Sequence, residues 1–261
     1  MSFNYKLQQY LRYKLRAKNE FSLHSPFMFD LYNAVFKKAN KRNAEFDFIE
    51  HIRKHILKNH QVITINDLGA GSMKSNSYVR KISSIAKTAS KPKKYARFLA
   101  ELAYYMKSKN ILELGTSLGF STMYIAKKNS ESVITSIEGS HEIQALALLN
   151  FNQSELKNIN TIVGDFDKVL PDLLSKYTYD LIFIDGNHTY EATIRYFEWI
   201  KTHSSTNTVI IFDDIYWDSN MTKAWKKIIE DKRITATIDM FEFGIVFFND
   251  NLAKQDFCLR Y

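Results

Sequence analysis

Residues 110–121 constrain the fold more than any other part of this sequence. An apolar run at 111–114 is typical of a strand buried on both faces, and a helical pattern follows at 120–127. Between them lie Gly115 and Gly119. A buried strand, a glycine turn and a helix N-terminus together let a ligand approach backbone N–H groups closely. The segment therefore predicts a small-molecule site at the end of a buried strand.

The chain after residue 90 alternates regularly between strand and helix patterns. Strands are predicted at 110–115, 132–138, 159–164, 180–185 and 207–213, and helices at 120–128, 141–156, 166–175, 189–202 and 220–230. This order predicts an α/β fold with a parallel sheet covered by helices on both faces. The last two strand patterns, at 234–240 and 244–248, are too close together for a crossover. They predict a closing antiparallel hairpin.

The first part of the chain is predicted to be a basic, mainly helical N-terminal extension over 1–89, followed by the α/β domain over 90–261. A strand at 62–65 leads into a second glycine-rich loop, Asp67–Ser72, and a basic helix is expected from about Tyr78. No second strand is predicted between this loop and residue 110, so the loop is not taken as the main site. A lid over the site and a structural turn remain alternative roles for it.

Charge and cysteine content indicate which partners and which cellular compartment to expect. Residues 1–110 hold 22 Lys+Arg against 7 Asp+Glu, whereas residues 111–261 hold 14 against 21. The basic first part could attract nucleic acid, an acidic metabolite or a membrane surface, or could be a solvated lysine-rich face. The single cysteine, together with the absence of a signal-peptide pattern and of a long apolar run, favours a cytoplasmic protein.

Acidic residues stand at the ends of three of the predicted strands. Glu138 could accept hydrogen bonds from both hydroxyls of a ribose, as acidic residues do at this point of nucleoside-binding sheets. Asp185, Asp213 and Asp214 follow two neighbouring apolar strands, where converging carboxylates would repel one another unless a cation or a proton neutralised them. Such oxygen ligands suit Mg²⁺.

These motifs resemble those of class I S-adenosylmethionine (SAM)-dependent methyltransferases. The segment Glu113–Gly119 matches the E-x-G-x-x-x-G form of their first motif, and 184–190 and 209–217 resemble the cation-dependent O-methyltransferases of the catechol and caffeoyl-CoA type and the related I-D-G-x-H family. The resemblance implies a Rossmann-like, seven-stranded sheet and methyl transfer to a hydroxyl of a small molecule. It also implies SAM contacts from Glu113, Gly115, Thr116, Ser117, Gly119, Ser121, Glu138, Gly139, Asp165 and Asp185.

The same resemblance suggests the catalytic residues. Asp185, Asp213 and Asp214 would hold Mg²⁺, or Mn²⁺ or Ca²⁺, although Asp214 stands where that family has Asn. His188 replaces the family's lysine as general base, because a neutral imidazole titrates near neutral pH. An orienting or metal-binding role is the alternative for His188. With Asp185, it is the predicted catalytic pair.

Other functions remain open at this level. An RNA methyltransferase could use the basic N-terminal region, and an NAD-binding or non-catalytic protein could share the sheet, although G-x-G-x-x-G is missing. A homodimer is also possible. His51 and His55 have metal-ligand spacing without a third ligand nearby, and His24 is expected to pack or cap a helix.

Overall fold

The structure is a computed structural model that describes residues 3–66 and 77–261, and it divides the chain into two compact units. One unit comprises residues 30–169, and the other comprises residues 1–29 and 170–261. The loop predicted at 67–72 lies outside the described residues. The boundary predicted between residues 89 and 90 separates two sequence patterns and not two compact units. It stays a prediction.

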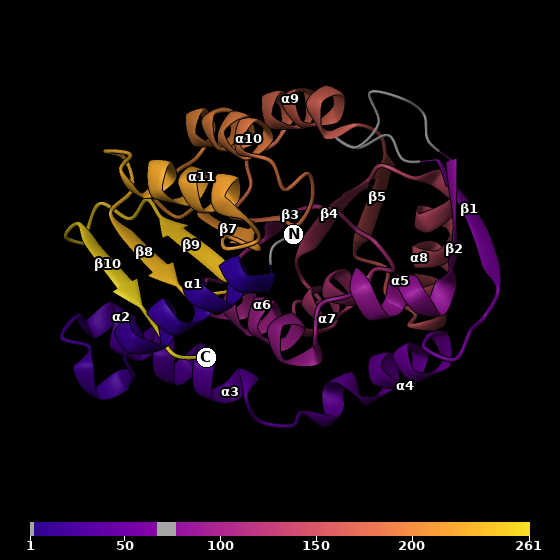
Figure 1. Cartoon of the computed structure of the whole chain (residues 1–261), viewed down its shortest axis with the longest axis horizontal. Helices are drawn as coiled ribbons and strands as arrows, with labels where there is room; N and C mark the ends of the chain where they lie inside the picture. The colour runs from indigo at the N-terminus through magenta and orange to yellow at the C-terminus, as the bar shows by residue number, and fades with distance from the viewer. Residues whose placement is uncertain (1–2, 67–76) are drawn as a thin grey trace. The chain divides into compact units, whose positions relative to one another are not determined.

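The unit of residues 30–169 contains three parallel strands in the order β3-β4-β5. They are β3 (Asn110–Leu114), β4 (Val133–Glu138) and β5 (Ile159–Val163), and they alternate with helices α7 (Phe120–Lys128) and α8 (His141–Gln153). Helix α6 (Lys93–Tyr105) lies beside α7 (Figure 1). The alternation and the element types predicted for this part of the chain are confirmed, with boundaries that differ by at most three residues.

The earlier part of this unit differs from the prediction at one element. Residues 77–81 form strand β2 (Ser77–Lys81), antiparallel to β1 (Val62–Asn66), where a basic helix was expected from Tyr78. The helix α5 (Ile82–Thr88) begins only after this strand. The prediction was wrong because pairing with β1 satisfies the backbone of 77–81, and a distant partner of this kind leaves no local sequence pattern.

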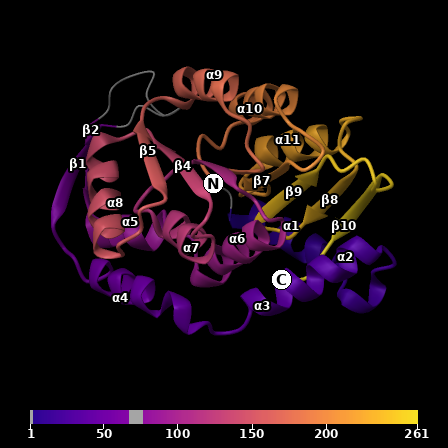
Figure 2. The same ribbon diagram turned by 180° about the vertical axis from the view of Figure 1, so that it is seen from behind.

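Further helices cover this unit and bury its apolar residues. Helix α4 (Asp47–Ile56) turns Ile49 and Ile52 into a core that also contains Phe120, Tyr124 and Phe151. Residues 26–39 form one helical stretch that includes α2 (Pro26–Leu31) and α3 (Lys37–Ala39), and residues 30–39 of it belong to this unit. Figure 2 shows α8 from behind, where it lies beside β1 and β5. The core therefore joins the helical segment 44–56 to the first α/β repeats.

The other unit carries five strands in the order β10-β8-β9-β7-β6. They are β6 (Leu181–Ile184), β7 (Val209–Asp213), β8 (Ala236–Asp239), β9 (Phe243–Phe247) and β10 (Gln255–Cys258). Strands β6 and β7 are parallel, and β9 is antiparallel to both β7 and β8, which confirms the predicted closing hairpin. The edge strand β10, parallel to β8, was not predicted and is an addition to the seven strands expected.

Three helices accompany these strands. Helices α10 (Tyr190–Thr202) and α11 (Ser219–Ile229) lie side by side, as Figure 1 shows, and α9 (Phe166–Lys176) precedes β6. Gly244 of β9 lets the Trp225 ring of α11 pack closely, because a Cβ there would lie 2.7 Å from the ring. Helix α1 (Phe3–Arg16) belongs to this unit although it lies at the other end of the sequence. None of the helices among the described residues is both long and apolar enough to cross a membrane.

Candidate functional site

The glycine loop between β3 and α7 has the backbone that the sequence pattern predicted. Gly115 has φ 102° and Gly119 has φ 78°, both in the left-handed region where side chains are strained. At Gly119 a Cβ would also lie 2.3 Å from a ring carbon of Phe151. Ser117 adopts φ 49° between the two glycines. The loop therefore turns sharply and opens directly into the first turn of α7.

Below this loop, Glu113 is fully buried and holds the turn in place. Its Oε1 accepts a hydrogen bond from Ser121 (2.5 Å), and its Oε2 accepts hydrogen bonds from Thr122 and from Ser136 (2.7 Å). Burial raises the pKa of Glu113, while the three hydroxyl donors oppose that shift. Glu113 and Ser121, both predicted to contact the cofactor, thus contact each other and tie β3 and β4 to α7.

The residue predicted to bind a ribose stands beside the same loop. Glu138 ends β4, and its carboxylate accepts hydrogen bonds from the backbone N–H of Ser117 (2.7 Å) and of Ser140 (3.1 Å). Gly139 separates Glu138 from Ser140, the N-cap of α8. Because a carboxylate has about four acceptor positions, two backbone donors can fix its orientation while further donors bind. The contacts bring Glu138 and the glycine loop together.

Two more of the predicted cofactor residues make local contacts. Thr116 is buried, and its hydroxyl lies 2.6 Å from that of Ser136. Asp165 accepts a hydrogen bond from the N–H of Asp167 (3.0 Å) at the start of α9, as an ordinary helix cap does. The predicted contact of Asp165 with adenine stays a prediction.

In the other unit, Asp185, His188 and Asp213 form a group of potential metal ligands. One ligand atom from each of these residues lies within 4.8 Å of the other two. Asp185 follows β6 and Asp213 ends β7, whereas His188 lies in the loop before α10. The Nε2 of His188 is 3.8 Å from Asp185 Oδ1, and Asp213 is only 1% exposed. The structure thus places His188, the predicted base, within this group of potential metal ligands.

Asp214, the third predicted metal ligand, is held by a different partner. Its Oδ1 accepts a hydrogen bond from Lys6 Nζ of α1 at 3.1 Å, and Lys6 also lies 3.5 Å from Glu242. Asp214 has φ 50°, in the left-handed region that few residues other than glycine adopt. Its backbone N–H donates to the carbonyl of Glu242, and its carbonyl accepts from Trp217. Among the described residues, Asp214 is not part of the ligand group.

Sequence reasoning missed Lys6. This lysine lies 208 positions from Asp214 in a segment rich in lysine and arginine, so nothing in its neighbourhood distinguishes it. Its ammonium group also lies 5.7 Å from the centre of the Trp217 ring and 5.8 Å from that of Phe241. The one available signal was the helical spacing of residues 6, 10 and 13, which predicts a shared face of α1.

Three other histidines were considered in the sequence: His51, His55 and His24. His51 and His55 lie on consecutive turns of α4 with ring centres 4.3 Å apart, and both are exposed. Within 3–66 and 77–261 they belong to no group of three metal ligands. His24 precedes the first turn of α2, where Ser25 Oγ accepts a hydrogen bond from the Met28 N–H.

Part of the chain is similar in sequence to known methyltransferases. Residues 112–215 match a protein family described as a methyltransferase domain. A catechol O-methyltransferase of Niastella koreensis is 30% identical over 131 residues, which are 48% of this chain and 58% of the relative. One from Mycobacterium tuberculosis is 26% identical over 121 residues, 46% and 54% of the two chains. The chain thus spans little more than half the length of the curated relatives it matches.

Solved structures show the same fold. The SAH-bound methyltransferase of Podospora anserina aligns with a TM-score of 0.56 at 16% identity, covering 81% of this chain and 99% of that one. The O-methyltransferase of Bacillus cereus, crystallised with SAH, aligns with a TM-score of 0.55 at 18% identity over 79% and 91%. The chain therefore shares its Rossmann-like fold with these methyltransferase structures, and residues 112–215 are similar in sequence to a methyltransferase domain.

Proposed function

We propose that this protein transfers the methyl group of SAM to a hydroxyl of a small molecule with the help of a divalent cation. The observation that carries the proposal is the presence of two sites in the same chain. One is the glycine loop with Glu138 fixed beside it, and the other is the Asp185–His188–Asp213 group. The matched methyltransferase domain, residues 112–215, contains both sites, which supports a common role.

The glycine loop and Glu138 would hold the methyl donor. Left-handed Gly115 and Gly119 leave the backbone accessible, and Glu138 offers an oriented carboxylate to the ribose hydroxyls. The chemistry of the site fits SAM, because an acidic residue suits a ribose and the loop need not cradle a phosphate. SAM, when bound, supplies a methyl group on a positively charged sulfur.

The second site would hold the cation through two carboxylates and one imidazole. A divalent cation there would lower the pKa of the substrate hydroxyl and so favour the oxygen as a nucleophile. Mg²⁺ and Ca²⁺ prefer oxygen ligands, whereas imidazole suits Mn²⁺ and other transition metals better. The presence of His188 among the donors therefore favours Mn²⁺ over Mg²⁺.

His188 then has two possible roles that exclude each other at Nε2. As a ligand it would bind the cation, and as the predicted base it would take the hydroxyl proton. Its position within the donor group favours the ligand role, since a ligand atom from each of the three residues falls within 4.8 Å. In that case the cation's effect on the hydroxyl pKa replaces much of the need for a strong base.

Titrations of the full chain test the proposed SAM site and the proposed cation site separately. Calorimetry with S-adenosylhomocysteine should show one site, weakened roughly 10–100-fold by Glu138→Ala, because a hydrogen-bonding carboxylate is lost. Glu131→Ala, at an exposed residue paired with Lys109, is the control. If Glu138→Ala binds S-adenosylhomocysteine as tightly as wild type, or if the wild type shows no site, the assignment of the SAM site is wrong.

Mn²⁺ titration followed by electron paramagnetic resonance tests the cation. One site should weaken at least about 10-fold in Asp213→Asn and in His188→Gln, because each variant loses a ligand. If His188→Gln keeps the Mn²⁺ affinity but loses methyl transfer to catechols or other hydroxyl compounds, His188 is the base. If the wild-type protein binds no Mn²⁺, the reaction is independent of this cation. In that case an RNA substrate becomes the next candidate.

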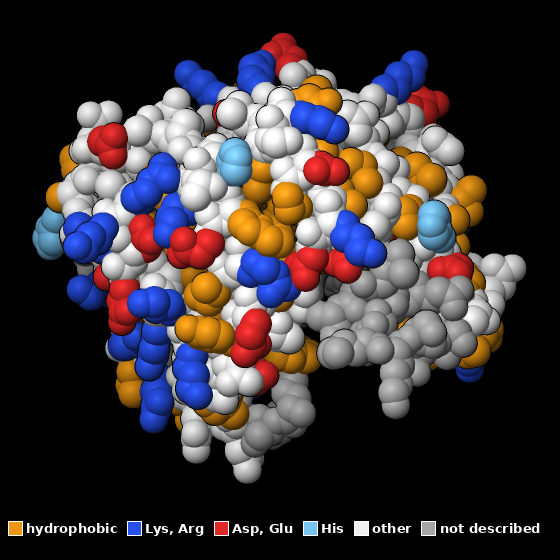
Figure 3. Space-filling view, turned by 90° about the horizontal axis from the view of Figure 1, so that it is seen from above, with side chains coloured by type: hydrophobic (Ala, Val, Ile, Leu, Met, Phe, Trp, Pro, Cys, Tyr) orange, Lys and Arg blue, Asp and Glu red, His pale blue; other side chains and the backbone are white. Residues whose placement is uncertain are grey.

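The RNA alternative rests on the basic N-terminal region alone. On the face shown in Figure 3, many Lys and Arg side chains stand among Asp and Glu side chains, and several others gather at the lower left of the view. Three other expectations stay predictions: a cytoplasmic location, a homodimer, and an extension over residues 1–89 that caps the site.

A further inference from the structure

Helix α1 presents a row of leucines outward. Leu7, Leu11 and Leu15 recur every four residues, so they share one face of the helix. They are 44%, 56% and 89% exposed, and Phe21, a few residues beyond the helix, is 85% exposed. Single exposed apolar residues are common in proteins, but a continuous row of them along a helix indicates a binding surface.

The opposite face of α1 is firmly attached to its own unit. Tyr13 is buried, and its hydroxyl donates to the carbonyl of Leu259 at 2.7 Å. Lys6 pairs with Asp214, and Arg16 contacts Tyr216 (3.1 Å) and Asp239 (3.2 Å). These contacts hold the helix at both ends and in the middle. The leucine row is therefore fixed outward, and its exposure does not come from a loose helix.

Basic residues accompany this row. Arg12, Lys14 and Lys18 are exposed, and Lys14 lies over the Tyr10 ring at 5.3 Å. Residues 1–19 contain no Asp or Glu, so nothing within this stretch offsets the positive charge. The outer face of α1 thus combines an apolar stripe with cations beside it. A basic amphipathic helix of this composition is typical of segments that lie in the interface of a membrane.

We propose that α1 docks the protein onto the surface of an anionic lipid bilayer. The leucines would enter the boundary between head groups and acyl chains, while Arg12, Lys14 and Lys18 contact the lipid phosphates. An RNA ligand would use the cations but would gain nothing from the three leucines. The helix is held on its own unit by these contacts and, like the other helices of the described residues, is not long and apolar enough to cross a membrane. The bilayer would therefore meet only its outer face.

Vesicle flotation with the full-length protein tests this proposal. Wild type should bind vesicles that contain phosphatidylserine, and bind vesicles of phosphatidylcholine alone far more weakly. The variant Leu7→Gln/Leu11→Gln/Leu15→Gln should lower the partition coefficient at least about 10-fold, because the apolar insertion is lost. Arg12→Gln/Lys14→Gln should lower it as well, and added salt should weaken binding of the wild type.

The variant Leu148→Gln/Leu149→Gln is the matched control, because it replaces exposed leucines on α8 instead. It should bind vesicles like wild type. Thermal unfolding of every variant should stay close to wild type, since the replaced side chains are exposed. Three outcomes would overturn the proposal: no binding of wild type to anionic vesicles, equal binding by the triple-leucine variant, or a dimer that this variant dissociates while lipid binding is absent.

Discussion

Lys6 and Asp214 form an ion pair of 3.1 Å between the first helix and the end of β7. Glu242 lies on the other side of the same ammonium group at 3.5 Å, and the rings of Trp217 and Phe241 flank it. Burial alone would lower the pKa of Lys6, but attraction to Asp214 and Glu242 outweighs it and raises the pKa above its usual value. The pair gives Asp214 a partner other than a metal ion.

The ion pair predicts separate behaviour of the two neighbouring aspartates. Asp214→Asn should change the Mn²⁺ affinity by less than about 3-fold, whereas Asp213→Asn should weaken it at least about 10-fold. The reason is that Asp213 belongs to the group of potential metal ligands, whereas Asp214 is hydrogen-bonded to Lys6. Paramagnetic resonance titration of both variants measures this. An equal loss in Asp214→Asn would restore Asp214 as a metal ligand.

Removing Lys6 should destabilise the folded state in a pH-dependent way. Because its pKa is raised on folding, its contribution is present below pH ~10.5 and is lost as pH rises through the folded pKa. Lys6→Met should cost about 0.5–1 kcal/mol at pH 7. Urea unfolding measures the cost, which should shrink in an Asp214→Asn background. A loss of the same size in both backgrounds would mean that the ion pair contributes nothing.

Gly119→Ala should destabilise the protein by about 1–3 kcal/mol. The residue has φ 78°, and its new Cβ would lie 2.3 Å from the Phe151 ring. Adding Phe151→Leu should recover only part of the loss, because the backbone strain remains. Thermal unfolding and S-adenosylhomocysteine titration measure the two effects. Wild-type stability in Gly119→Ala would mean that the loop tolerates another backbone conformation.

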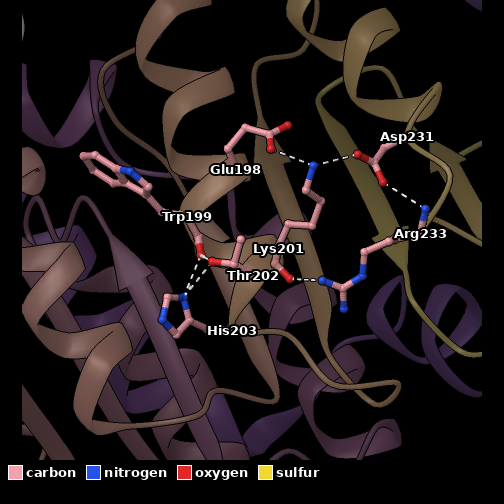
Figure 4. A network of polar contacts seen from close by, with 7 residues as sticks. All are labelled: Glu198, Trp199, Lys201, Thr202, His203, Asp231 and Arg233. Carbon is pink, nitrogen blue, oxygen red and sulfur yellow. Dashed lines mark hydrogen bonds and ion pairs between the residues drawn. The ribbon is translucent and has the colours of Figure 1, made fainter.

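A polar network joins the end of α10 to the segment before β8 (Figure 4). Lys201 Nζ lies 2.6 Å from Glu198 and 2.8 Å from Asp231, and Asp231 also accepts from the Arg233 N–H (2.9 Å). The guanidinium of Arg233 donates to the carbonyl of Lys201. Burial would raise the pKa of Asp231, but these donors outweigh it and lower the pKa.

A lowered pKa means that Asp231 stabilises the fold above pH ~3.9 and loses this effect as pH falls through the folded pKa. Asp231→Asn should therefore cost about 0.5–1 kcal/mol at pH 6 and progressively less below pH 4. Urea unfolding at several pH values gives the profile, with the exposed Asp250→Asn as the control. A cost that does not change with pH would contradict the role of the charge.

Cys258 should resist modification in the native protein. Burial raises the pKa of its thiol to about 12, from an ordinary value of 9.0. The thiolate fraction at pH 8 is then lower by roughly three orders of magnitude than for an ordinary thiol. Alkylation by iodoacetamide should be correspondingly slow, and fast in urea. Rapid labelling of the folded protein would show that the β10 edge opens.

The sequence by itself determined the α/β repeats, the glycine loop and the closing hairpin. These features depend on neighbouring residues: the apolar run of β3, the turn at Gly115 and Gly119, and the short link before β9. Their physical causes, side-chain periodicity and backbone freedom, act within a few residues and are therefore visible in the sequence. The acidic strand ends were visible for the same reason.

Only the tertiary structure decided which distant residues meet. It paired β2 with β1 where a helix was expected, and it added β10 beside β8. It also brought His188 next to Asp185 and Asp213 and placed Lys6 on Asp214. These pairings are set by packing and charge across more than 200 positions in the case of Lys6, and no local pattern encodes such contacts.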